Sequence, residues 1–141
     1  AGGDLHNFVE VHDSSFAEGD GGGVYISKFY KVDVHNSRFE RNRAERGAGA
    51  KFEHIRFLDV RDCTFHENAA KLAGGAFEFN SSIPYSADFD LTNVALTENT
   101  APSNAPGACN YDEKSGEQHF HFSKIKLSAG AGKSDCPGLV H

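Results

Sequence analysis

The sequence predicts an all-β fold, a right-handed parallel β-helix or β-solenoid of about five rungs, and three observations support this. A Phe-x-x-Asn motif recurs at Phe39-x-x-Asn42 and Phe65-x-x-Asn68, and more loosely at Leu96-x-x-Asn99. Glycine pairs or near-pairs separate the copies, and apolar residues alternate with polar ones within each copy. A repeat of this length indicates that each copy is one supersecondary unit, which buries its apolar face only against its neighbours.

The copies align into columns when Phe16 is taken as the anchor. The anchor column is Phe16, Phe39, Phe65, Leu96 and Leu127. The other inward columns are Val9, Val32, Leu58, Phe89 and Phe120; Val11, Val34, Val60, Leu91 and Phe122; and Ser14, Ser37, Cys63, Val94 and Ile125. The alternation along each copy is typical of a half-buried strand. We therefore expect one domain over residues 1–141, with rungs at about 1–20, 21–46, 47–73, 74–106 and 107–141.

A bend is predicted within each copy, where the alternation slips by one residue. The slip falls on Asp13, Asn36, Asp62 and Asn93. Asn and Asp tolerate the left-handed backbone region better than other residues with side chains, so a tight bend fits there. The fifth copy has Lys124 at this place, and we expect its rung to be irregular.

Stacking of the rungs explains why like residues recur in columns. Neighbouring strands lie about 4.8 Å apart, so each column becomes a ladder along the stack. The amides of Asn42, Asn68 and Asn99 are expected to hydrogen-bond along such a ladder. Parallel crossovers are nearly always right-handed, which gives the expected hand. The alternative is an antiparallel sandwich of short strands with glycine turns, which offers no reason for identity within columns.

The middle of the chain resembles a known family. The segments Gly22-Gly23-Val24-Tyr25-Ile26 and Gly74-Gly75-Ala76-Phe77, with Phe-x-x-Asn-x-Ala at 39–44 and 65–70, resemble repeats of the chlamydial polymorphic outer-membrane proteins. The resemblance covers roughly residues 14–101. It implies a right-handed β-helix that serves as a surface adhesin.

Composition is compatible with a rigid secreted module. The chain has 15 glycines and neither Met nor Trp, and it begins at Ala1, as a mature product or a segment of a longer protein would. A net charge of −6 argues against a nucleic-acid partner, because phosphate neutralisation requires clustered Lys and Arg. No apolar stretch reaches the length of a membrane span. We expect an extracellular or cell-surface location.

Three cysteines leave one pair and one single residue. Cys63 occupies an inward column, so it is expected to act as a small buried apolar residue. Cys109 and Cys136 lie where the repeat decays, and we expect a disulfide between them, as in proteins of oxidising compartments. The sequon Asn80-Ser81-Ser82 makes Asn80 a glycosylation candidate if the source is eukaryotic.

An outward column of acids holds the candidate chemistry. It consists of Glu10, Asp33, Asp59 and Asp90, followed by His121. Like charges at strand spacing repel, and the next outward column supplies His12, His35 and Arg61 as countercharge. The favoured interpretation is a solvated ladder without a cofactor or catalytic residue. The alternatives are a weak Ca²⁺ site at Asp33, Asp59 and Asp90, and a polysaccharide lyase or hydrolase that uses Asp59, Arg61 and Asp90.

The ends of the stack suggest a function. A stack of parallel strands leaves an open edge at each end, which proteins usually cover. Residues 1–3 already belong to the first rung, and residues 130–141 are too short and glycine-rich for a helical cap. We therefore expect a structural protein that stacks head to tail with itself into a filament or surface appendage. The chief rival is an adhesin or passenger rod that binds a receptor or glycan, and the enzyme comes third.

Overall fold

The protein is all-β. The computed structural model describes residues 8–81, 87–102, 109–113 and 118–128, and these residues form strands and connecting turns without a helix. The strands are β1 (Phe8–His12), β2 (Ser15–Ala17), β3 (Val24–His35), β4 (Arg38–Glu40), β5 (Arg43–Arg46), β6 (Ala50–His66), β7 (Ala69–Ala73), β8 (Phe77–Ser81), β9 (Ala87–Thr97), β10 (Cys109–Glu113) and β11 (Gln118–Ser128).

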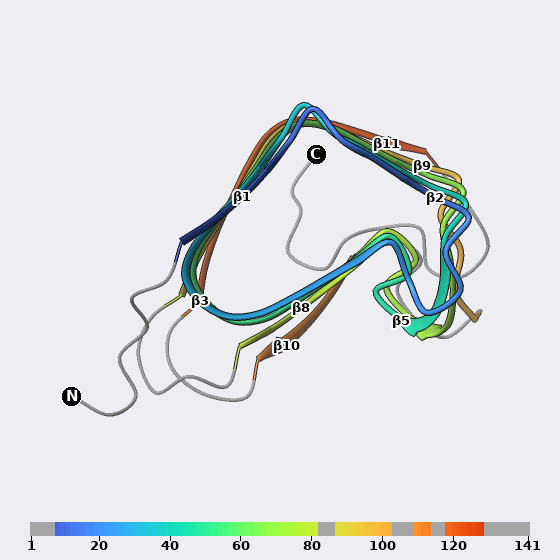
Figure 1. Cartoon of the computed structure of the whole chain (residues 1–141), viewed down its shortest axis with the longest axis horizontal. Helices are drawn as coiled ribbons and strands as arrows, with labels where there is room; N and C mark the ends of the chain where they lie inside the picture. Colours follow the sequence, from blue (N-terminus) through green and yellow to red (C-terminus); the bar gives the residue numbers. More distant parts are fainter. Residues whose placement is uncertain (1–7, 82–86, 103–108, 114–117, 129–141) are drawn as a thin grey trace.

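Every pairing between the described strands is parallel. A nine-stranded sheet contains all strands except β5 and β7, which pair with each other. In Figure 1 the strands β1, β3, β6, β9 and β11 follow nearly the same bent path, one upon another. The parallel, all-β part of the prediction is confirmed, and the antiparallel sandwich is wrong.

The register of the sheet is the one that the aligned columns give. Val9 pairs with Val32, Val32 with Leu58, and Leu58 with Phe89. Phe39 lies between Phe16 and Phe65 in the same way. Each strand therefore places its apolar residues directly beside the equivalent residues of the next repeat.

The strands bend where a residue takes a positive φ. The first set of bends is Asp13 (50°), Asn36 (51°), Asp62 (54°), Asn93 (53°) and Lys124 (56°). A second set, which the sequence pattern did not reveal, is Glu18 (58°), Arg41 (53°), Glu67 (55°) and Glu98 (55°). Lys28 and His54 bend the longest strands a third time, with φ of 66° and 54°.

The irregularity expected at Lys124 is wrong for the described part of the last repeat. Lys124 takes the same left-handed conformation as the Asn and Asp residues of its column. The strand β11 stays in register with β9 from Gln118 to Ser128, and Lys124 alone is left out of the pairing. Contacts with the neighbouring repeat thus impose the bend on a residue that does not favour it.

The core consists of ladders of apolar side chains. Val32, Val34, Phe39, Phe65 and Leu96 are 0% exposed. The rings of Phe39 and Phe65 stack with centroids 4.5 Å apart and an interplanar angle of 7°. The strands β3, β6 and β8, which begin shortly after glycines, complete the core with further buried residues. These are Ile26, Ala50, Phe52, Phe77 and Phe79.

A buried polar ladder runs beside the phenylalanines. Asn68 Oδ1 accepts hydrogen bonds from the backbone N–H and the side-chain amide of Asn42, both at 3.0 Å. Asn68 Nδ2 donates to Asn99 Oδ1 at 2.9 Å and to the carbonyl of Phe39 at 2.8 Å. A Cβ on Gly23 would lie 2.9 Å from Asn42 Nδ2 and 2.5 Å from the Gly49 carbonyl oxygen, so glycine is required beside the ladder.

Replacing Asn68 by alanine should destabilise the protein by about 3 kcal/mol or more, because two buried backbone groups lose a partner. Those groups are the N–H of Asn42 and the carbonyl of Phe39. Chemical unfolding of the variant measures the loss. Asn36→Gly serves as the control, since it removes an exposed amide at a positive φ and should cost less than about 1 kcal/mol. Equal losses in the two variants would contradict a stabilising role for the buried ladder.

Candidate functional site

The acidic column forms a continuous row on the outside of the sheet. Glu10 pairs with Asp33, Asp33 with Asp59, and Asp59 with Asp90. His121 of β11 pairs with Asp90 and continues the row. The parallel register therefore brings together four carboxylates from four strands, as the sequence predicted.

Asp59 is a partly buried carboxylate of this row. Partial burial raises the pKa of Asp59 above its ordinary value, and the charges of Asp33 and Asp90 add to the rise. Arg61 opposes it, with its Nε 3.9 Å from Asp59 Oδ2. The repulsion within the row is thus only partly relieved at its centre.

Two histidines flank the carboxylate at the β1 end of the row. His12 Nε2 lies 3.4 Å from Glu10 Oε1, and His35 Nε2 lies 3.7 Å from the same oxygen. The two rings stack with centroids 5.4 Å apart. The hydrogen bond between His12 Nδ1 and Asp13 Oδ2, 3.1 Å long, raises the pKa of His12 and lowers that of Asp13.

An aromatic groove lies beside the acidic row. Its volume is about 460 Å³. It is lined by Phe8, Tyr30, Lys31, Phe57, Leu58, Asp59, Asp88 and Asp90. The ring of Tyr30 meets those of Phe8 and Phe57 edge to face, with centroids 5.8 Å and 5.3 Å away. Phe8 is 68% exposed and Tyr30 36%.

Sequence reasoning missed this groove, although a signal was present. Phe8 and Phe57 immediately precede Val9 and Leu58, which share an inward column. Because side chains alternate along a strand, Phe8 and Phe57 are expected to point outward. Arg56 stacks over the Phe57 ring at 4.2 Å and pairs with Asp88 at 2.9 Å. Large aromatic residues at outward positions are informative because an exposed apolar cluster often marks a contact surface.

The Ca²⁺ site at Asp33, Asp59 and Asp90 stays a prediction. These aspartates are neighbours in register, but they are not a group whose ligand atoms all lie within 4.8 Å of one another. In the described part of the chain, the ligand atoms that all lie within 4.8 Å of one another belong to a different group, His66, Glu67 and Glu98.

The His66 group has the ligand atoms of a divalent-cation site, but its side chains also contact one another. His66 Nε2 lies 3.0 Å from Glu67 and 4.0 Å from Glu98. Its Nδ1 is 2.7 Å from Thr97 Oγ1, which orients the ring. Both carboxylates are exposed, so their contacts with the histidine contribute little to stability.

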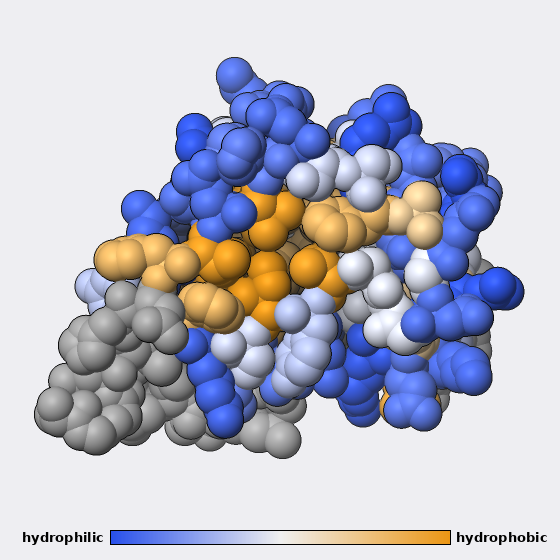
Figure 2. Space-filling view, viewed as in Figure 1, coloured by the Kyte–Doolittle hydropathy of each residue, from blue (hydrophilic) through white to orange (hydrophobic). Residues whose placement is uncertain are grey.

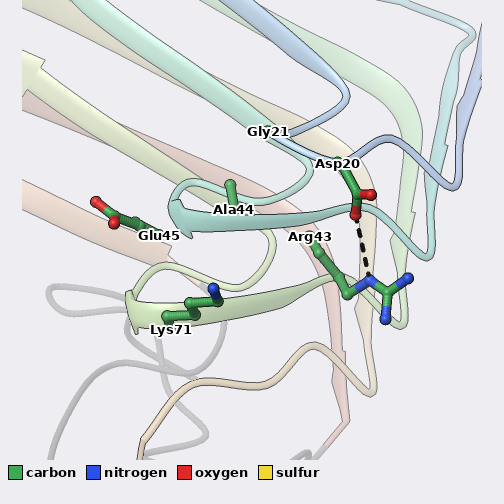
Figure 3. A pocket seen from close by; sticks show the side chains of 6 residues that line it. All are labelled: Asp20, Gly21, Arg43, Ala44, Glu45 and Lys71. Carbon is green, nitrogen blue, oxygen red and sulfur yellow. Dashed lines mark ion pairs between the residues drawn. The ribbon is translucent and has the colours of Figure 1, made fainter.

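A second cavity lies at the small sheet of β5 and β7. It measures about 570 Å³. Figure 3 shows the Asp20–Arg43 ion pair, 3.7 Å long, at one side of it and Glu45 and Lys71 at the other. Opposite charges on exposed residues are thus spread around this cavity, without a close pair of carboxylates among the labelled side chains.

The cysteine and glycosylation predictions fall largely outside the described residues. This holds for Cys136 and for the side chains of Cys109 and Asn80. Cys63 is buried, and its Sγ donates to the carbonyl of Arg61 at 3.2 Å. Burial raises the pKa of its thiol to about 11, so Cys63 is unsuited to act as a nucleophile.

Comparisons with protein families, curated proteins and solved structures found no match. Among the residues that the structure describes, there is no helix long and apolar enough to cross a membrane.

Asp59→Asn should raise the free energy of unfolding at pH 7. The native state holds the Asp59 proton more tightly than the unfolded chain does, so ionisation costs native stability as pH rises through the folded-state pKa. The gain should therefore be present at pH 7 and disappear below the ordinary carboxyl pKa. Urea unfolding at pH 7 and pH 3 measures it. Asp20→Asn, at an exposed aspartate outside the row, is the control, and an equal gain there would refute this explanation.

Proposed function

We propose that the chain is a right-handed parallel β-solenoid with a structural role outside the cell, which stacks head to tail with further copies into a filament or surface appendage. The solenoid is supported by parallel pairing between equivalent residues of successive repeats and by recurrent bends at equivalent positions. The stacking is supported by the state of the core columns at the two outer repeats.

The observation that carries the proposal is that the inner ladders remain open at the β1 end. Val32, Val34 and Phe39 are 0% exposed, whereas Val9, Val11 and Phe16 in the same columns are only partly buried. Figure 2 looks onto this end and shows a hydrophobic centre ringed by hydrophilic side chains. At the other end of the stack, Phe122 and Ile125 are likewise partly buried.

A further copy is the partner that fits both ends best. The surface at β1 is a strand edge with apolar residues at fixed spacing and a bend at Asp13, and β11 has the same alternation and the equivalent bend at Lys124. Joining two such ends continues the sheet without closing it, and this kind of contact produces linear assemblies.

A binding role is the second candidate, and the aromatic groove favours it. The exposed Phe8 and Tyr30 beside Asp59 and Asp90 offer apolar faces together with hydrogen-bond acceptors. Such a surface suits an adhesin that holds a glycan or a receptor. The groove is on the side of the stack, so binding there is compatible with stacking.

Electron microscopy and sedimentation of the purified protein over a range of concentrations test the assembly. We expect unbranched particles one chain wide that lengthen as the concentration rises. Val11→Arg places a charge in the open column at β1 and should suppress them. Leu72→Arg is the matched control, because Leu72 is 48% exposed on β7, whose neighbours lie on both sides of it in the stack.

Circular dichroism should show both variants folded. Monodisperse single chains of the unmodified protein at high concentration would contradict the assembly, as would particles that Val11→Arg leaves unchanged. A folded monomer that binds glycans or a receptor protein through the groove would favour the second candidate.

A further inference from the structure

We infer that the junction between two copies has one register, in which Lys124 of one copy faces Asp13 of the next and His121 faces Glu10. This inference rests on the proposed stacking and adds the identity of the contacts. It also makes the partner a second copy in one orientation only.

The register follows from continuing the pairing that the chain already has. In the β9–β11 pair, His121 lies beside Asp90 and Phe122 beside Leu91. In the β1–β3 pair, Glu10 lies beside Asp33 and Val11 beside Val34. These residues share columns, so the next strand beyond β11 places Glu10 at His121, Val11 at Phe122 and Asp13 at Lys124.

The bend column carries the first charge contact. Inside the chain, this column pairs acids with amides, since Asn36 Nδ2 donates to Asp13 and Asn93 Nδ2 donates to Asp62 Oδ1 at 2.7 Å. The column begins with an acid, Asp13, and ends with a cation, Lys124. A junction therefore puts opposite charges together at the point where the pattern of acid and amide would otherwise stop.

The acidic row carries the second contact. It begins with Glu10 and ends with His121, which is exposed. If an acid stood at position 121, five carboxylates would stack within one copy and meet a sixth across the junction. The histidine instead offers Glu10 a hydrogen-bond donor.

The groups already around Asp13 and Glu10 leave their outer sides accessible. His12 contacts both carboxylates, at 3.1 Å for Asp13 and 3.4 Å for Glu10, and His35 contacts Glu10. Even so, the side chain of Glu10 is 57% exposed and that of Asp13 is 63% exposed. Lys124 is also exposed. The side chains of Glu10, Asp13 and Lys124 are therefore accessible to a neighbouring copy.

These contacts explain why copies would stack head to tail and not head to head. A contact between two β1 ends would set against each other two edges that both carry Glu10 and Asp13. A contact between two β11 ends would likewise set against each other two edges that both carry Lys124. Opposite charges across one arrangement and like charges across the others give orientation specificity, whatever their contribution to affinity.

Charge reversal tests the register. Asp13→Lys and Lys124→Asp should each raise the concentration needed for half-maximal assembly about tenfold, because each replaces an attraction by a repulsion. The double variant, in which the charges are exchanged, should recover most of the loss. Asp62→Lys is the matched control, since it makes the same change in the same column inside the stack, and it should leave assembly unaltered.

The outcomes separate the register from the proposed function. If the unmodified protein assembles but the single variants do so equally well, or if the double variant is worse than both, the register is wrong while stacking stands. If the unmodified protein does not assemble, both are wrong. Lys124→Asp installs a residue type that the same bend holds at Asp13 and Asp62, so it keeps the test valid if Asp13→Lys does not fold.

Discussion

The buried amide ladder of Asn42, Asn68 and Asn99 is the interaction on which the spacing of the repeats depends. Each amide is buried, and its partners lie in the neighbouring repeats. A slip of one residue would leave these polar groups unpaired in an apolar interior, at a high cost in free energy. The ladder therefore fixes one register, and the apolar columns follow it. Phe39 and Phe65 stack nearly parallel at 4.5 Å for this reason, although offset or edge-to-face rings are usually preferred.

The first repeat differs from the others in a way that suits an end of the stack. Gly19 stands in the column of the asparagines, and its backbone N–H donates to Asn42 Oδ1 at 2.9 Å. The polar ladder thus finishes on a backbone group, and no side-chain amide of this column faces outward at the β1 end. The surface left there combines the apolar residues of the inner columns with the charged residues of the outer ones. Such a surface suits a contact that forms after folding, since it buries apolar area without buried amides that require partners.

Much of the strand register could be read from the sequence, because side-chain identity repeats in columns. The type and spacing of Phe39, Phe65 and Leu96 predict one column. Asp13 and Asn36 predict one bend, because these residue types tolerate a positive φ. The second set of bends was not predictable, because Glu67, Glu98 and Arg41 have no preference for that conformation. Each of the three immediately precedes an asparagine of the ladder, so the bend lies next to the residue that enters the ladder. Lys124 was misjudged for the same reason, as packing against β9 decides its backbone and its own propensity does not.

The candidate sites were less predictable than the fold, for a physical reason. The acidic row is a single column, and a one-dimensional alignment finds it directly. The groove of Phe8, Tyr30 and Phe57 and the group of His66, Glu67 and Glu98 combine residues from different columns. Such combinations depend on how far each bend turns the chain, and the sequence does not state this.

The direction of the hydrogen bonds has a mechanical consequence. Both the backbone bonds between strands and the amide bonds from Asn42 to Asn99 join one repeat to the next. Tension along the stack therefore loads many of these hydrogen bonds at once, along their own direction. The repeat with the fewest hydrogen-bond partners should then separate first. Tension across the stack meets the covalent backbone of the strands. Material built from this chain would accordingly be stiff across its thickness and would yield along its length between whole repeats.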